Sequence, residues 1–294
     1  MVNLDRLEAF WCDAIHDQGM LRTLSNKCKR ISYIGFRCEI SSHHWSFVTN
    51  AASSRSLSVD VEAELRAFDG LKILDLSSYS RGFGMPLANS STLLNNIPVS
   101  VKAIHLTDEP IRLANASQLQ KCTKHLETVR LTRFTSWMHD KIRTLITFDH
   151  MNLRELKLSR SWFVNLVGMT TWLQDACRNA AFPRLTFLEV ACASEYAIGP
   201  EYLQDHEWLG FDKALVQFVR THTQLVALIV SGCPQGYEIG KALDDLPSLR
   251  ALSVTLSHII NLSTLQQLRL SQKLSWLELN LPGDMVDKTL WVSL

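Results

Sequence analysis

One six-residue pattern, LxxLxL with Val or Ile allowed in place of Leu, recurs along the chain and constrains its fold more than any other feature. The copies are LKILDL (71–76), VKAIHL (101–106), LETVRL (126–131), LRELKL (153–158), LTFLEV (185–190), LVALIV (225–230), LRALSV (249–254) and LSWLEL (274–279). ISYIGF at 31–36 is a further, looser copy. Successive copies from residue 71 onward start 24 to 40 residues apart. Recurrence at about this period is the signature of a solenoid of stacked repeats.

Each copy contains the signal of a short strand, and its first apolar residue turns the chain inward before that strand begins. Its last three positions alternate apolar, any, apolar, which is the period of a strand with one buried face. Between copies the spacing becomes helical, as in DKIRTLITF, TTWLQDACRNAAF and KALVQFVRTH. One strand and one helix cannot bury both apolar faces alone, but stacked copies form a continuous core. The sequence therefore predicts an α/β solenoid with a curved parallel sheet on the concave side and helices or irregular segments on the convex side.

The chain resembles the leucine-rich repeat family over residues 71–280. In that family the pattern usually continues to an Asn or Cys, a position that only Cys233 fills here. The corresponding residues in the other copies are Tyr79, Glu109, Phe134, Ser161, Ala193, Ser257 and Pro282. The uneven repeat lengths are similar to the irregular intracellular type, and most similar to the repeat region of F-box proteins. An F-box itself is not recognisable in the sequence.

We expect a single solenoid domain over residues 1–294. Residues 1–30 are expected to form a helical N-terminal cap and 31–280 the repeats, while 281–294 form either a C-terminal cap or a truncated repeat. The helical cap is predicted from an apolar stripe at helical spacing within residues 3–17. Its members are Leu4, Leu7, Trp11 and Ile15. Solenoids need such caps over the exposed core of the terminal repeat.

Composition excludes several classes of protein. The net charge of +1 argues against bulk attraction to nucleic acid or to an anionic membrane. The sequence contains no apolar run near the roughly 20 residues that span a bilayer, and its start does not have the pattern of a signal peptide. The odd set of seven cysteines lacks a CxxC pair. We therefore expect a reduced, cytoplasmic or nuclear protein that binds neither nucleic acid nor membrane.

Motifs that carry chemistry are sparse. HExxH, GxxxxGK[ST] and GxSxG do not occur in the sequence. Cys122 and His125 in CTKH are close in sequence, but zinc generally takes four ligands, and no third group identifies a nucleophile–base pair. We predict no catalytic residue, no metal and no cofactor. A hydrolase using Cys122 and His125 is kept as the weaker alternative.

The expected partner surface lies on the outward positions of the strands. Positions three, five and seven of each copy point away from the core. The predicted contact residues of this concave face are His105, Arg130, Arg133, Lys157, Arg160, Glu189 and Trp276. The long inter-strand segments 79–98 and 193–211 are predicted to add contacts from loops. These are Tyr79, Arg81, Phe83, Tyr196, Tyr202 and Trp208.

A surface several strands wide suits a protein partner better than a small molecule. The predicted function is a non-enzymatic protein-interaction scaffold. The resemblance implies a substrate-recognition subunit of an SCF-type ubiquitin ligase, with a Skp-type adaptor as partner only if an F-box lies upstream. The basic residues from His105 to Arg160 favour an acidic or phosphorylated segment of the partner. A leucine-rich-repeat inhibitor or scaffold unrelated to ubiquitination is the alternative.

Overall fold

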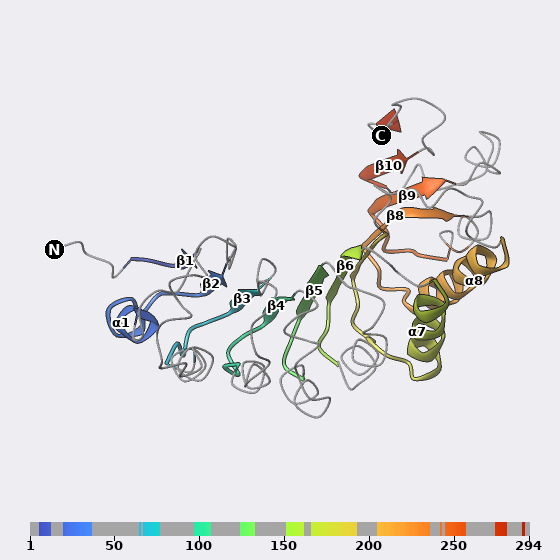
Figure 1. Ribbon diagram of the computed structural model, residues 1–294. Helices are drawn as coiled ribbons and strands as arrows, with labels where there is room; N and C mark the ends of the chain where they lie inside the picture. Colours follow the sequence, from blue (N-terminus) through green and yellow to red (C-terminus); the bar gives the residue numbers. More distant parts are fainter. Residues whose placement is uncertain are drawn as a thin grey trace, which may run out of the picture. The chain divides into compact units, whose positions relative to one another are not determined.

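The chain divides into two units, residues 1–132 with 140–145, and residues 133–139 with 146–294. The computed structural model (Figure 1) describes residues 6–12, 20–36, 65, 67–76, 97–106, 124–132, 151–161, 166–192, 205–235, 242, 245–256, 274–280 and 290–291.

The first unit contains five parallel strands that neighbour one another in chain order. They are β1 (Ala9–Cys12), β2 (Tyr33–Phe36), β3 (Ile73–Leu76), β4 (Ala103–Leu106) and β5 (Thr128–Thr132). Helix α1 (Met20–Lys27) lies between β1 and β2 in the chain. Parallel strands that are adjacent both in sequence and in space require the chain to coil in one direction, which is the topology of a solenoid.

The second unit repeats this arrangement and adds two long helices. Its parallel strands are β6 (Glu155–Ser161), β7 (Phe187–Cys192), β8 (Ala227–Gln235), β9 (Ala251–Leu256) and β10 (Trp276–Asn280). The short strand β11 (Leu290–Trp291) pairs antiparallel with β10. Helix α7 (Leu166–Arg178) connects β6 to β7, and α8 (Asp205–Thr221) connects β7 to β8. Figure 1 shows these two helices side by side.

Burial follows the motif as predicted. In the motif copy that supplies β6, the core positions Leu153, Leu156 and Leu158 are 1%, 0% and 6% exposed, whereas Glu155 and Lys157 are partly exposed. The same alternation runs through β4 and β5. The predicted α/β leucine-rich-repeat solenoid is therefore confirmed, and the looser copy at 31–36 supplies β2.

A repeated backbone contact joins one copy of the motif to the next. The carbonyl of the second motif residue accepts two N–H groups, those of the second and third residues of the following copy. Lys72 O, for example, accepts from Lys102 N at 2.8 Å and Ala103 N at 3.0 Å, and Arg250 O accepts from Ser275 N and Trp276 N in the same way. The motif thus fixes the stacking of neighbouring repeats as well as the direction of side chains.

A turn before several of the strands contains a second buried position that the motif does not include. The first motif residue donates its N–H to the carbonyl three residues earlier, as Leu71 does to Phe68, Leu185 to Phe182 and Leu225 to His222. Phe68, Phe182 and His222 are all buried. These repeats are therefore anchored at one position more than the sequence pattern indicates.

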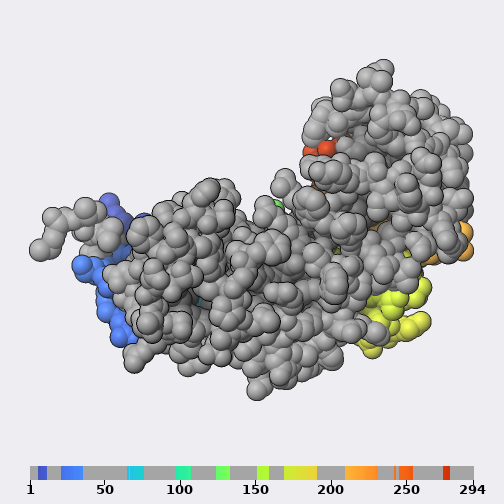
Figure 2. Space-filling model, viewed as in Figure 1, coloured from blue at the N-terminus to red at the C-terminus, as the bar shows by residue number. Residues whose placement is uncertain are grey.

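Helices α7 and α8 pack through aromatic side chains. The Trp172 ring centre lies 6.3 Å from that of Phe182 and 5.9 Å from that of Phe218. His222, just past the end of α8, places Nε2 2.9 Å from the carbonyl oxygen of Ala181. The predicted helical spacing of TTWLQDACRNAAF and KALVQFVRTH is confirmed, while DKIRTLITF lies outside the described residues. Both helices reach the molecular surface, where Figure 2 shows them in yellow-green and orange.

The predicted helix over residues 3–17 is wrong at its centre. Residues Ala9–Cys12 form strand β1, which pairs in parallel with β2, and the helix near this end begins only at Met20. Pairing with β2 satisfies the backbone groups of the strand, and this outweighs a helical stripe of apolar residues. Trp11 is 46% exposed and does not lie in the core. Leu4 and Ile15 lie outside the described residues.

Candidate functional site

Three polar side chains converge on the outward face of the first unit. Tyr33 Oη donates a hydrogen bond to Asp75 Oδ2 at 3.0 Å, and His105 Nδ1 lies 3.0 Å from the same oxygen. The neighbouring strands β2, β3 and β4 bring them together, because Asp75 pairs in register with Gly35 on one side and His105 on the other. Asp75 is only 7% exposed, although its motif position points outward.

The surroundings of Tyr33 make this cluster a partly buried one. Burial, and then the charge of Asp75 and the bond to it, raise the pKa of the Tyr33 phenol well above its ordinary value. The Trp11 ring stacks on Tyr33 with 6.0 Å between the ring centres. Gly35 has no side chain, which leaves room for Trp11, since a Cβ atom at this position would collide with the Trp11 ring. The sequence did not predict this arrangement.

The second unit carries two rows of outward-facing side chains across β7–β10. The third motif positions form the Phe187–Trp276 row, whose members in strand order are Phe187, Ala227, Ala251 and Trp276. The fifth positions form the Glu189–Glu278 row, whose members are Glu189, Ile229, Ser253 and Glu278. All are partly exposed except Ala227 at 8% and Ser253 at 1%. Ser253 Oγ donates to Glu278 Oε2 at 2.8 Å.

Lys157 lies beside the Glu189–Glu278 row, on β6. Its Nζ is 3.7 Å from Glu155 Oε2 and 4.5 Å from the ring centre of Phe187. The Lys157 ammonium is therefore shared between a carboxylate and an aromatic face within its own unit, an arrangement that lowers its availability to an anionic ligand.

The predicted partner-binding residues are placed as follows. Arg130 on β5 is exposed, and Glu189 and Trp276 on β7 and β10 are partly exposed. His105 pairs with Asp75, and Lys157 pairs with Glu155. Within the second unit, β7–β10 bring Glu189 and Trp276 onto one surface.

Several predicted residues cannot be placed on a surface in this way. Arg160 lies in β6 and Trp208 in α8. The prediction of a loop through residue 211 is therefore wrong from Asp205 onward, because α8 begins there and its buried face includes Phe211 and Leu215. The remaining predicted residues lie outside the described residues. They are Arg133, Tyr79, Arg81, Phe83, Tyr196 and Tyr202.

Of the alternative catalytic pair, the structure describes only His125. Cys122 lies outside the described residues, and His125 is an exposed turn residue before Leu126. Within the described ranges, no group of three His, Cys, Asp or Glu side chains could hold a metal ion. Cys177 is half-buried, and burial raises the pKa of its thiol, which makes it a poor nucleophile.

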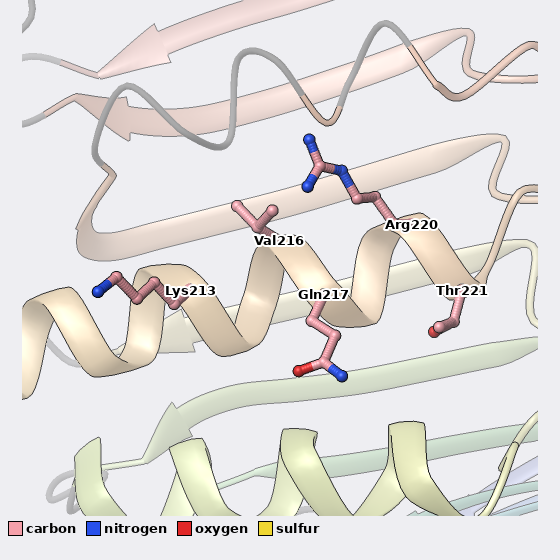
Figure 3. Close-up of a pocket in the computed structure, with 5 residues that line it drawn as sticks. All are labelled: Lys213, Val216, Gln217, Arg220 and Thr221. Carbon is pink, nitrogen blue, oxygen red and sulfur yellow. The ribbon is translucent and has the colours of Figure 1, made fainter.

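A hollow of about 370 Å³ lies along α8 and is lined by Lys213, Val216, Gln217, Arg220 and Thr221 (Figure 3). Arg220 Nε pairs with Asp245 Oδ2 at 3.2 Å, and Thr221 Oγ1 donates to the Phe218 carbonyl at 2.7 Å. The polar groups of Arg220 and Thr221 thus bond within the protein, and we assign no ligand to this hollow.

The described part of the chain includes no helix that is long and apolar enough to cross a membrane.

Comparison with known proteins gives structural neighbours only. No protein-family model matches the chain, and no curated protein matches it. The leucine-rich repeat-containing protein LegL7 from Legionella pneumophila is similar in structure, with 13% sequence identity, a TM-score of 0.49 and coverage of 93% of this chain and 83% of that one. The C-terminal domain of tropomodulin from Caenorhabditis elegans is similar over 55% of this chain and 93% of that one, with 10% identity and a TM-score of 0.35.

Proposed function

We propose that this protein is a non-enzymatic scaffold that binds a protein partner through the outward-facing side chains of its parallel strands. The observation that carries the proposal is the pair of rows across β7–β10, where aromatic and charged side chains stand in register and partly exposed. Four neighbouring strands at about 4.8 Å spacing make these rows about 14 Å wide. Aromatic residues beside charged ones are typical of protein interfaces.

Affinity purification of the full chain from cells tests this function. The wild type is compared with a Phe187→Ala/Trp276→Ala variant and with a control, Val99→Ala/Met151→Ala, which truncates exposed apolar residues elsewhere. Loss of a reproducible partner from the first variant, with retention by the control, supports the scaffold. A wild-type protein that retains no partner, or equal retention by all three proteins, contradicts it.

A finer proposal is that the scaffold serves as a substrate-recognition subunit of an SCF-type ubiquitin ligase in the cytoplasm or nucleus. Its support is the resemblance of the repeat spacing to F-box proteins. The test is whether a Skp-type adaptor or a cullin co-purifies with the protein encoded by the complete gene. If neither is recovered, the scaffold function remains and the ligase role is rejected.

The partner segment expected from the sequence is acidic or phosphorylated. Arg130 supports this proposal best, because it is exposed, whereas His105 and Lys157 each have an acidic neighbour in their own unit. Arg130→Glu and Lys157→Glu are tested separately, with and without phosphatase treatment of the cell extract. We expect Arg130→Glu to release the partner, and equal retention at all salt concentrations would reject the proposal.

The enzyme alternative has a direct test of its own. A hydrolase that uses Cys122 and His125 would lose its activity in Cys122→Ala and His125→Ala variants. We expect both variants to behave like the wild type in every cellular assay that responds to deletion of the gene.

A further inference from the structure

We propose that the outward face of β7–β10 binds an extended, basic segment of a protein partner, in which two cationic side chains stand four residues apart with an apolar side chain midway. The inference rests on the proposed scaffold function and specifies the chemistry of the segment recognised there. It arises from the Phe187–Trp276 and Glu189–Glu278 rows. The charged members of these rows are acidic, whereas the sequence drew attention to basic residues.

The first step is charge. Glu189 and Glu278 are partly exposed and stand at the two ends of their row, on strands β7 and β10. Ser253 Oγ donates to Glu278 Oε2 at 2.8 Å, so this carboxylate is held toward the middle of the row. A carboxylate has lone pairs for more than one donor, and charge-assisted bonds to ammonium or guanidinium groups are the strong ones.

The second step is the balance of charge around the rows. Among the outward third and fifth positions described on β6–β10, the acids are Glu155, Glu189 and Glu278, and the one base is Lys157. Lys157 lies 3.7 Å from Glu155, whose charge it offsets. With three acids and one base, these described positions carry a net negative charge, which attracts a basic segment and disfavours an acidic one.

The third step is the aromatic side chains. The Lys157 ammonium already lies 4.5 Å from the ring centre of Phe187, which shows that this face accommodates a cation over an aromatic ring. Trp276 is partly exposed at the other end of the same row. Tryptophan is the side chain that attracts cations best by this interaction. At the β10 end the surface therefore combines a carboxylate with an aromatic ring, whereas at the β7 end the Phe187 ring already carries Lys157 and Glu189 supplies the charge.

The fourth step is length. Three strand spacings of about 4.8 Å separate the positions of Glu189 and Glu278 by about 14 Å. Four residues of extended chain at about 3.3 Å each cover about 13 Å, and side chains i, i+2 and i+4 lie on one face. Cations at i and i+4 can therefore reach the two glutamates, while the side chain at i+2 lies midway, between Ile229 and Ser253.

The experiment measures binding of a fluorescent Lys-x-Leu-x-Lys peptide to the full chain by anisotropy. The Glu189→Gln/Glu278→Gln variant removes both charges and keeps the shape, and Glu189→Lys/Glu278→Lys reverses them. The control Asp69→Lys/Glu127→Lys makes the same change in net charge at residues of the first unit that belong to neither row. Unfolding midpoints of all variants verify that each is folded.

We expect charge reversal to weaken binding by about tenfold or more, neutralisation to weaken it less, and the control to bind within about twofold of the wild type. Binding should weaken as NaCl rises from about 50 to about 300 mM, and a peptide with Glu in place of Lys should not bind. Binding of the basic peptide that is equal in the reversed and wild-type proteins, or absent from the wild type, overturns the inference.

These outcomes are separable from those of the scaffold test. A cellular partner that Phe187→Ala/Trp276→Ala releases but Glu189→Lys/Glu278→Lys retains leaves the scaffold intact and rejects the basic segment. Peptide binding that depends on both glutamates, in a protein that retains no cellular partner, supports the site and rejects the scaffold.

Discussion

The two units place acidic residues at the same position of the repeated motif and use them in different ways. Asp75 in the first unit and Glu189 and Glu278 in the second all occupy the fifth position. Asp75 is 7% exposed and has the Tyr33 hydroxyl and the His105 ring as neighbours at 3.0 Å. Glu189 and Glu278 remain partly exposed.

The difference teaches that the motif determines the direction of a side chain, while neighbours on adjacent strands determine its burial. A carboxylate loses its hydration at little net cost only where hydrogen-bond donors replace water. Strands β2 and β4 supply two such neighbours to Asp75. An acid at an outward position therefore remains a surface charge only where the adjacent strands do not supply side chains that bury it.

The largest expected effect tests the motif itself, which both units share. Leu156→Asp in the second unit and Ile104→Asp in the first place a carboxylate at buried fourth positions that are 0% and 1% exposed. We expect each to cost more than about 4 kcal/mol in the free energy of unfolding. Lys157→Ala, whose side chain points outward, should cost under about 1 kcal/mol. Denaturant unfolding measures all three, and similar midpoints for Leu156→Asp and Lys157→Ala would contradict the assigned faces.

The next effect separates the two acids directly. Asp75→Ala removes the acceptor of the Tyr33 hydroxyl and the neighbour of the His105 ring, and we expect it to cost about 1–3 kcal/mol. Glu189→Ala, at the same motif position, should change the free energy of unfolding by less than about 0.5 kcal/mol. Equal destabilisation by the two substitutions in urea would show that burial at this position does not depend on the neighbouring strands.

The sequence was sufficient for features that repeat and insufficient for features that occur once. The motif predicted the strands, their parallel order and the buried leucines, because each copy supports the same assignment. The motif puts Asp75 at an outward fifth position, and nothing in that strand alone reveals the side chains of the strands on either side that bury it. The sequence also assigned Trp11 to a helix, since an apolar stripe over residues 3–17 has no copies against which to check the period.

The buried position three residues before several copies of the motif is only partly visible in the sequence, because Thr123, His150 and Ser271 precede other copies. Among the described residues at this position, Phe68, Phe182 and Leu246 are apolar and buried, and His222 is polar and buried. The polar residue is explained only by tertiary structure, because its Nε2 lies 2.9 Å from the carbonyl of Ala181 on the neighbouring repeat. The two rows across β7–β10 were predicted only in part, through Glu189 and Trp276, because the side chains that stand beside these two depend on four strands in register.

A pH effect distinguishes the first unit from the second. Burial, then the charge of Asp75 and the bond to it, raise the pKa of Tyr33 above its ordinary value of 10.0. The folded protein keeps this proton at a pH where the unfolded chain loses it, so the contribution to stability is complete below pH 10.0 and falls as the pH rises above it. Urea midpoints between pH 8 and 11 should therefore fall more steeply in the wild type than in Tyr33→Phe. Parallel curves would contradict a buried, hydrogen-bonded phenol.

The smallest expected effect is a stabilisation in the second unit, at the end of α7. Ala181 N donates to Ala176 O at 2.9 Å and Ala180 N to Cys177 O at 3.2 Å, which together form the Schellman arrangement that ends many helices. Its left-handed residue is Ala180, with φ of 48°, a position where glycine avoids the steric penalty of a Cβ atom.

Ala180→Gly should therefore raise the free energy of unfolding by up to about 1 kcal/mol, because the relief of strain at Ala180 exceeds the entropy that glycine adds to the unfolded chain. The matched control is Ala176→Gly, four residues earlier, where the residue is helical and fully buried, and where the same substitution should destabilise by about 1 kcal/mol or more. Urea unfolding of the two variants and the wild type measures whether each substitution raises or lowers the free energy of unfolding. A loss of stability in Ala180→Gly as large as that in Ala176→Gly would mean that α7 does not end in this left-handed turn.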